Sequence, residues 1–86
     1  MGKYEKLRQA ILSGNRDDNL DFNDILWFVE KSGYERKHNK TSGSHQIFVN
    51  KETKQMLNLQ EKNGKAKAYQ IKQLRKQIKE EDGYEE

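Results

Sequence analysis

The residue best suited to chemistry is His45, which follows a run of Thr, Ser and Gly in the stretch KTSGSHQIFVN. An unperturbed imidazole titrates near pH ~6.5 and can take and return a proton at neutral pH. RNA carries its own nucleophile, the 2′-hydroxyl, so one proton-transfer residue and nearby positive charge can cleave it without a metal. A single histidine in a polar turn is also commonly just solvated or hydrogen-bonded. From residue types alone, both interpretations stay open.

A candidate phosphate-binding surface surrounds this histidine. Gly43 and Ser44 precede it, and a glycine turn lets backbone amides approach phosphate oxygens. Five cations lie nearby in sequence or across the expected loops: Arg36, Lys37, Lys40, Lys65 and Lys67. We expect them to attract an RNA backbone and to stabilise charge that develops on phosphorus.

The charge is unevenly distributed along the 86 residues, although the formal net charge is only +3. Residues 34–79 hold 12 basic and 3 acidic residues, a net charge of +9, whereas residues 80–86 hold 5 acidic residues and no basic one. A basic centre of this size favours a polyanionic partner such as nucleic acid. A solvated lysine-rich surface is the competing interpretation.

Several classes of function lack support. The chain has no cysteine and only two histidines, so a structural zinc site is not expected. It has no P-loop, dinucleotide fingerprint or nucleophile elbow. A metal-dependent nuclease would have to recruit Asp17, Asp18 or Asp21 from a loop. We therefore expect neither a metal nor a cofactor.

Two further side chains have a functional and a plainer interpretation. His38, in the basic segment YERKHNK, can contact phosphate, but ordinary exposure is favoured. Tyr69 can stack on a base, but packing against the sheet is favoured.

The spacing of apolar residues predicts three helices. Leu7, Ala10 and Ile11 recur at helical spacing before Gly14, which is a typical helix stop. Asp21 is placed to cap a second helix that ends at Gly33, with Phe22, Ile25, Leu26 and Val29 on its apolar face. A last amphipathic helix carries Ala68, Ile71, Leu74 and Ile78.

Between the second and third helices, the composition predicts strands joined by turns. We expect strands at residues 34–38, 46–50 and 54–59, with VNKETKQ as a hairpin connection and Leu57 and Leu59 facing the core. The middle strand faces inward through either Ile47 and Val49 or Phe48. QEKNGKAKA is expected to be a basic loop around Gly64.

The predicted order is helix, helix, strand, strand, strand, helix. This is an α+β two-layer sandwich, in which helices cover one face of a three-stranded antiparallel sheet, and it resembles the double-stranded-RNA-binding fold with an extra N-terminal helix. We expect a single domain over residues 1–79 and a flexible acidic tail over residues 80–86. With neither a long apolar run nor a signal peptide, a cytoplasmic protein that does not engage a membrane is expected.

Three blocks of the chain resemble the HicA-type toxins of bacterial toxin–antitoxin pairs. They are ILSGNRDDNLDFNDILWFVEKSGY, GSHQIF and LNLQEKNGKAKAYQIKQLRKQI, and the resemblance extends from about Lys6 to Lys79. The combination of Gly43-Ser44-His45 before an apolar strand with the later NLQ…GKAKAYQ block is specific.

The resemblance implies a small mRNA interferase, a metal-independent endoribonuclease that cleaves transcripts and arrests growth. It implies that His45 is catalytic, because His45 occupies the histidine position of the Gly-Ser-His motif. It also implies a HicB-type antitoxin that forms a hetero-oligomeric complex and covers the active site. Specific binding of operator DNA is not expected of the toxin itself.

The chain departs from the family pattern at three places. Gln46 replaces a second histidine that many members carry, Ala68 replaces a frequent proline, and the run NKTSGS before His45 is longer than the turn in many members. Two other functions remain open, a non-catalytic RNA-binding module of the same fold and a degenerate, inactive toxin.

Overall fold

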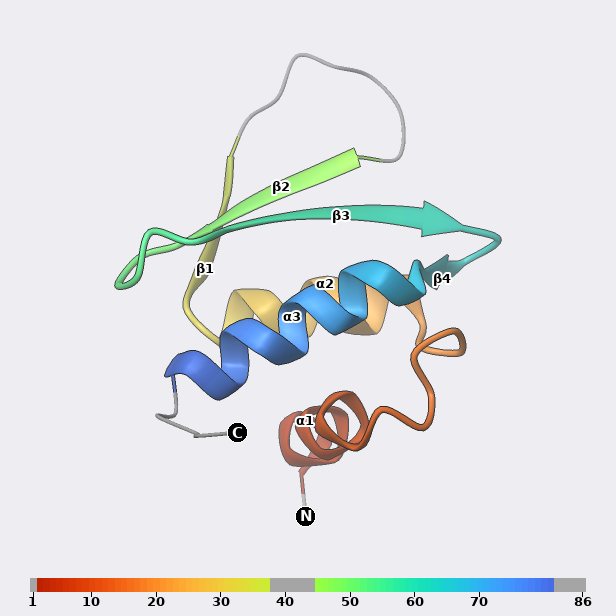
Figure 1. Ribbon diagram of the computed structural model, residues 1–86. Helices are drawn as coiled ribbons and strands as arrows, with labels where there is room; N and C mark the ends of the chain where they lie inside the picture. The colour runs from red at the N-terminus through yellow and green to blue at the C-terminus, as the bar shows by residue number, and fades with distance from the viewer. Residues whose placement is uncertain (1, 38–44, 82–86) are drawn as a thin grey trace.

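The computed structural model describes residues 2–37 and 45–81, which form three helices and a four-stranded antiparallel sheet (Figure 1). The elements follow the chain in the order α1 (Lys3–Ser13), α2 (Phe22–Lys31), β1 (Tyr34–Lys37), β2 (His45–Asn50), β3 (Met56–Lys62), β4 (Lys65–Ala66) and α3 (Ala68–Glu81). The predicted α+β class is confirmed. No helix within these residues is long and apolar enough to cross a membrane.

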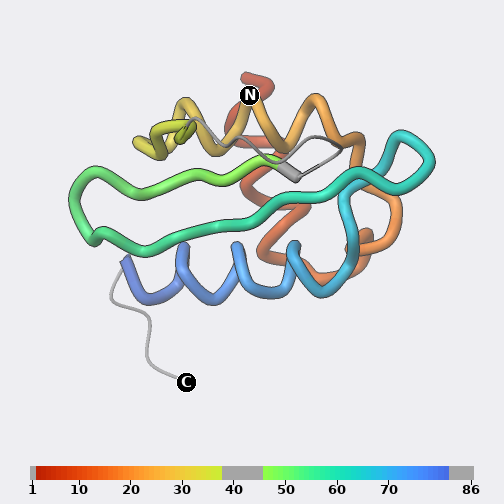
Figure 2. Tube along the Cα trace, turned by 90° about the horizontal axis from the view of Figure 1, so that it is seen from above, coloured from red at the N-terminus to blue at the C-terminus, as the bar shows by residue number. Residues whose placement is uncertain are grey.

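The sheet is a meander in which each strand pairs with its neighbour in the chain, in the order β1-β2-β3-β4. Figure 2 shows α2 and α3 flanking the long β2–β3 hairpin along its two sides, and Figure 1 shows both helices below the sheet. The first helix, α1, lies farther from the sheet and packs against α2 and α3. The helices therefore cover one face of the sheet.

Local signals set the helix ends as the sequence predicts. α1 ends at Gly14, whose φ of 75° is left-handed and favours glycine. Asp21 caps α2, because its carboxylate accepts hydrogen bonds from the backbone N–H groups of Asn23 and Asp24 at 2.9 and 3.2 Å. Tyr4 of α1 stacks on Phe28 and contacts the edge of Trp27, so α1 covers part of the broad apolar surface of α2.

The core lies between the sheet and the helices. Phe48 is fully buried and Ile47 and Val49 are only partly buried, which settles the phase of β2. Leu57 and Leu59 are also fully buried, as predicted for β3. The remaining buried apolar side chains come mainly from the helices: Ile11, Leu20, Phe22, Ile25, Phe28, Val29, Tyr34, Ala66, Ile71, Leu74 and Ile78.

The basic loop predicted around Gly64 is instead a tight hairpin, and the prediction of three strands was short by β4. Asn63 and Gly64 adopt φ values of 54° and 81°, the left-handed pair that a two-residue turn requires. This turn pairs Lys62 with Lys65 and Glu61 with Ala66. β3 consequently runs to Lys62, three residues beyond its predicted end.

The ends of two other elements also differ from the prediction. β2 begins one residue earlier than expected, at His45. α3 continues to Glu81, so Glu80 and Glu81, which the sequence assigned to the acidic tail, are helical. β1 ends at Lys37, and His38 lies outside the described residues.

Two buried glutamines of α3 satisfy the edge of β3 that the short β4 leaves uncovered. The Gln70 Oε1 atom accepts a hydrogen bond from the Gln60 backbone N–H at 2.6 Å. Gln77 Nε2 donates to the Met56 backbone carbonyl at 3.0 Å, and Gln77 Oε1 accepts from the Tyr34 hydroxyl at 2.6 Å. Because unpaired backbone groups are costly to bury, these side chains take the place of a longer fourth strand.

Candidate nucleic-acid interface

The residues predicted around His45 fall partly outside the described structure. Lys40, Gly43, Ser44 and the side chain of His45 lie outside the described residues. The backbone of His45 is described: it opens β2 and pairs with Gln60 of β3. The start of β2 therefore lies beside the part of β3 that leads into the β3–β4 hairpin.

Arg36 and Lys37 lie on β1 and interact with carboxylates of the chain itself. The Arg36 guanidinium is 3.8 Å from a Glu30 carboxylate oxygen and lies over the ring of Phe48. Lys37 Nζ donates to Glu35 Oε1 at 3.1 Å, and this hydrogen bond lowers the pKa of the exposed Glu35 carboxyl. The structure does not bring these two cations together with Lys65 and Lys67.

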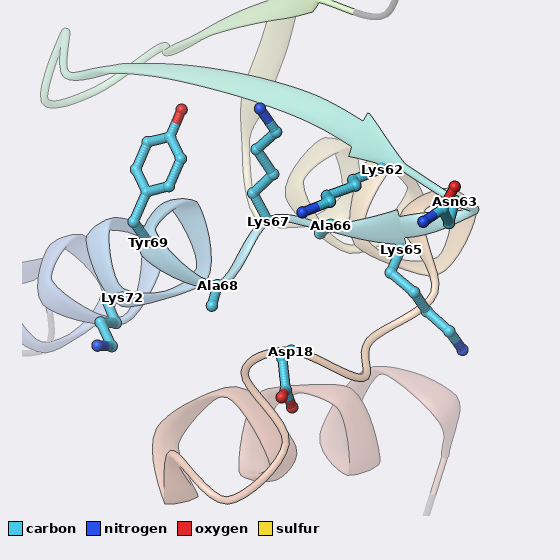
Figure 3. A pocket seen from close by; sticks show the side chains of 9 residues that line it. All are labelled: Asp18, Lys62, Asn63, Lys65, Ala66, Lys67, Ala68, Tyr69 and Lys72. Carbon is cyan, nitrogen blue, oxygen red and sulfur yellow. The ribbon is translucent and has the colours of Figure 1, made fainter.

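Lys65 and Lys67 line one cavity of about 690 Å³ beside the β3–β4 hairpin (Figure 3). Its lining comes from the α1–α2 loop, the hairpin and the first turns of α3: Asp18, Lys62, Asn63, Lys65, Ala66, Lys67, Ala68, Tyr69 and Lys72. The volume falls within the range of about 300–1,000 Å³ that is typical of small-molecule sites. Four of the nine lining residues are lysines, so the cavity favours anions.

The hairpin that carries these lysines is fixed on both sides. On one side, β4 pairs with β3. On the other, the Ala66 N–H donates to the Leu20 carbonyl at 3.0 Å, and the Phe22 N–H donates to the Gly64 carbonyl at 2.9 Å. The lysines therefore project from a backbone held by hydrogen bonds and not from a free loop.

Tyr69 is exposed, which contradicts the prediction that it packs against the sheet. Its side chain is 61% exposed at the second residue of α3. Its hydroxyl accepts a hydrogen bond from Gln70 Nε2 at 3.3 Å. The buried positions at the start of α3 are taken by Gln70 and Ile71, so the helix turns the Tyr69 ring toward the cavity.

Asp18 is the single carboxylate among the lining residues. Figure 3 shows it on the α1–α2 loop, on the side of the α3 start opposite to the Tyr69 ring, with its carboxylate directed away from that start. The first turn of α3 carries no acidic residue. Lysines therefore dominate the local charge, and Asp18 offsets it on one side only.

Lys62 and Lys72 line the cavity as well, and the sequence analysis did not single them out. Asn63-Gly64 is a strong signal for a two-residue hairpin, and such a turn places residues 62 and 65 opposite each other. Lys72 follows Tyr69 by three residues, so helical spacing places the two near each other. The turn signal and the helical spacing in EKNGKAKAYQIK could therefore have placed both lysines beside Lys65 and Tyr69.

Two of the three aspartates considered as metal ligands have structural contacts. Asp17 forms a two-pronged ion pair with Arg75, with N···O distances of 2.9 and 3.0 Å, which raises the pKa of the guanidinium. Asp21 caps α2. Within residues 2–37 and 45–81, no three His, Cys, Asp or Glu side chains form a group that could hold a metal ion.

Comparisons of the chain with protein-family models, with curated proteins and with solved structures find no match.

Proposed function

We propose that the protein is an endoribonuclease of the HicA toxin type, with His45 as the general acid/base. In this proposal, His45 takes the proton of an RNA 2′-hydroxyl, the 2′-oxygen attacks the adjacent phosphorus, and the 5′-oxygen leaves with a proton from water or a lysine. The products are a 2′,3′-cyclic phosphate and a 5′-hydroxyl. Gly43 and Ser44 shape the phosphate site, and Lys40, Lys65 and Lys67 attract the backbone.

The observation that carries the proposal is the position of the lysine cavity relative to His45. His45 of β2 pairs with Gln60 of β3, and Lys62, which lines the cavity, lies two residues beyond Gln60 on β3. RNA bound along β3 toward the hairpin would pass both the histidine and the lysines. The α+β architecture, with helices on one face of an antiparallel meander, supports the double-stranded-RNA-binding-like fold of this proposal.

The proposal includes a partner and a compartment. A HicB-type antitoxin would bind the toxin in a hetero-oligomeric complex, cover the lysines and His45, and so prevent RNA from entering. The substrate and the partner both place the protein in the cytoplasm.

The test compares wild type with His45→Ala, as purified proteins on mixed mRNA and after induced expression in cells. We expect wild type to cleave RNA in the presence of EDTA, to leave cyclic phosphate ends and to arrest growth, and His45→Ala to do none of these. Cleavage that EDTA abolishes and magnesium restores would contradict the histidine mechanism.

A non-catalytic RNA-binding module is the second candidate. The lysine cavity supports it because phosphate binding there does not require His45. In that case wild type binds RNA, leaves it intact, and keeps the same affinity after His45→Ala. A degenerate toxin differs from both, because it binds the antitoxin while showing neither cleavage nor growth arrest.

A further inference from the structure

We propose that the cavity beside the β3–β4 hairpin is a subsite for one nucleotide of single-stranded RNA, in which the Tyr69 ring stacks on the base and the surrounding lysines bind the flanking phosphates. This inference rests on the proposed function for its ligand, RNA, but not on catalysis by His45.

The Tyr69 ring is available to a base and yet held in place. Its side chain is 61% exposed, although large aromatic side chains are usually covered. Its hydroxyl accepts from Gln70 Nε2 at 3.3 Å, while Gln70 Oε1 accepts from the Gln60 N–H at 2.6 Å. Gln70 itself is only 2% exposed. The ring is thus anchored through a buried side chain to β3, which lowers the entropy lost when a ligand stacks on it.

Two of the lysines are placed to bind a phosphate beside that ring. Figure 3 shows Lys67 projecting in the same direction as Tyr69, toward β3, and Lys62 extending beneath β3 toward the same region. Lys65 and Lys72 point away from the Tyr69 ring and from β3. A base on the ring therefore has Lys67 and Lys62 toward a neighbouring phosphate.

The combination of an exposed ring and lysines is specific to an unstacked nucleotide. An anion without a base, such as inorganic polyphosphate, uses the lysines but not the ring. Double-stranded RNA keeps its bases stacked within the helix, so they cannot reach a tyrosine face. A single-stranded segment uses both, since any base has a face that stacks on an aromatic ring.

The subsite also lies at a definite place relative to His45. Gln60 is the backbone partner of His45 on β3 and, through Gln70, the residue that anchors Tyr69. A nucleotide bound on Tyr69 would therefore fix which phosphate of the bound RNA lies beside His45. Tyr69 is in this sense a positioning residue and does not take part in the reaction itself.

The experiment measures binding of a short fluorescein-labelled single-stranded oligoribonucleotide by fluorescence anisotropy, with every variant in the full-length His45→Ala protein so that the RNA stays intact. We expect Tyr69→Ala to weaken binding about fivefold to 100-fold, the range given by alanine substitution at stacked bases. Tyr69→Phe keeps the ring and should keep most of the affinity, whereas Tyr69→Leu keeps only apolar bulk and should behave like Tyr69→Ala. Circular dichroism of each variant checks that it is folded.

The charge component is tested by the dependence of binding on salt. Lys67→Gln and Lys62→Gln should each reduce the slope of log K against log salt by about 0.7, the value for one phosphate contact on a single strand. Lys51→Gln is the matched control, because Lys51 is exposed in the β2–β3 turn, at the opposite end of the sheet from the cavity. It should leave the slope unchanged.

Two results overturn the subsite. One is a Tyr69→Ala variant that binds the oligoribonucleotide as well as its parent. The other is a Tyr69→Ala variant that loses affinity equally for single-stranded RNA, for a duplex of the same sequence and for inorganic polyphosphate. That result would show that Tyr69 does not contact a base. Failure of the proposed function is distinguished by the cleavage assay, in which wild-type protein would leave RNA intact.

Discussion

The backbone N–H of Gln60 donates to Gln70 Oε1 at 2.6 Å and joins β3 to α3 at the point where the two-residue strand β4 no longer covers the sheet edge. Gln70 is 2% exposed, so water can replace its side-chain amide as the hydrogen-bond partner only when the domain opens. The same side chain holds the Tyr69 hydroxyl. A structural hydrogen bond and the orientation of a proposed RNA contact therefore depend on one residue.

Gln70→Leu should destabilise the protein by about 1–3 kcal/mol, because it removes a buried amide and leaves the partly buried Gln60 N–H without this acceptor. Urea denaturation followed by circular dichroism measures the change. Gln73→Leu is the control, since Gln73 lies exposed on the same helix and should shift stability by less than about 0.5 kcal/mol. Equal effects of the two substitutions would contradict the role of the buried amide.

Arg75→Ala should cost about 2–3 kcal/mol, somewhat less than the loss of one partner from a fully buried ion pair. The Arg75 and Asp17 side chains are 18% and 12% exposed, and Arg75 also donates to the Ile11 carbonyl at 2.9 Å. The pair fastens the α1–α2 loop to α3. Asp24→Ala, which removes the exposed pair with Lys3, should cost less than about 1 kcal/mol. A double-mutant cycle between Arg75 and Asp17 that gives no coupling would refute this account.

Stability should fall as the pH rises above about 10. Burial raises the pKa of the Tyr34 hydroxyl above its usual value. A hydrogen bond with Asn50 lowers this pKa, and the negative charge of Glu81 raises it, so the net shift is upward. The folded state thus keeps this proton to a higher pH than the unfolded chain does, so the contribution is complete below about pH 10 and is lost as the pH rises toward the folded pKa.

The comparison that isolates this effect is Tyr34→Phe against wild type, with unfolding measured from about pH 8 to 11. The variant loses the hydrogen bond to Gln77, at about 1 kcal/mol, near neutral pH. The difference in unfolding free energy between wild type and Tyr34→Phe should shrink at high pH. A constant difference over the whole range would show that Tyr34 does not contribute to the pH dependence.

Asp18→Asn should tighten RNA binding, because it removes the single carboxylate among the residues that line the cavity. For an exposed charge the expected gain is about twofold to fivefold at low salt, and it should vanish at high salt. Glu52→Gln, which changes charge equally in the turn after β2, is the control and should have a much smaller effect. Weaker binding by Asp18→Asn would mean that the carboxylate contacts the ligand favourably.

The helices could be predicted from the sequence because their signals are local. The Asp21 cap, the Gly14 stop and the apolar faces depend on residues within a few positions of one another. β4 was missed because two residues carry no periodicity, although the Asn63-Gly64 turn that creates it was visible.

Other features depend on contacts between residues far apart in the chain. Gln70 and Gln77 are buried because β4 leaves the edge of β3 uncovered, which no local pattern records. Tyr69 is exposed because the next two residues take the buried positions of α3. Lys65 and Lys67 line the same cavity, whereas the expectation that they lie near the His45 side chain stays a prediction.

The meander order of the sheet has a consequence for folding kinetics. Within the sheet each strand pairs with the next one along the chain, so these pairings close short loops, and the bridge between Asp21 and Lys65 is the long-range exception among the described residues. The chain also contains no proline, and therefore no slow isomerisation of a prolyl bond. Refolding from urea should be a single fast phase in stopped-flow fluorescence of Trp27, without a component lasting tens of seconds.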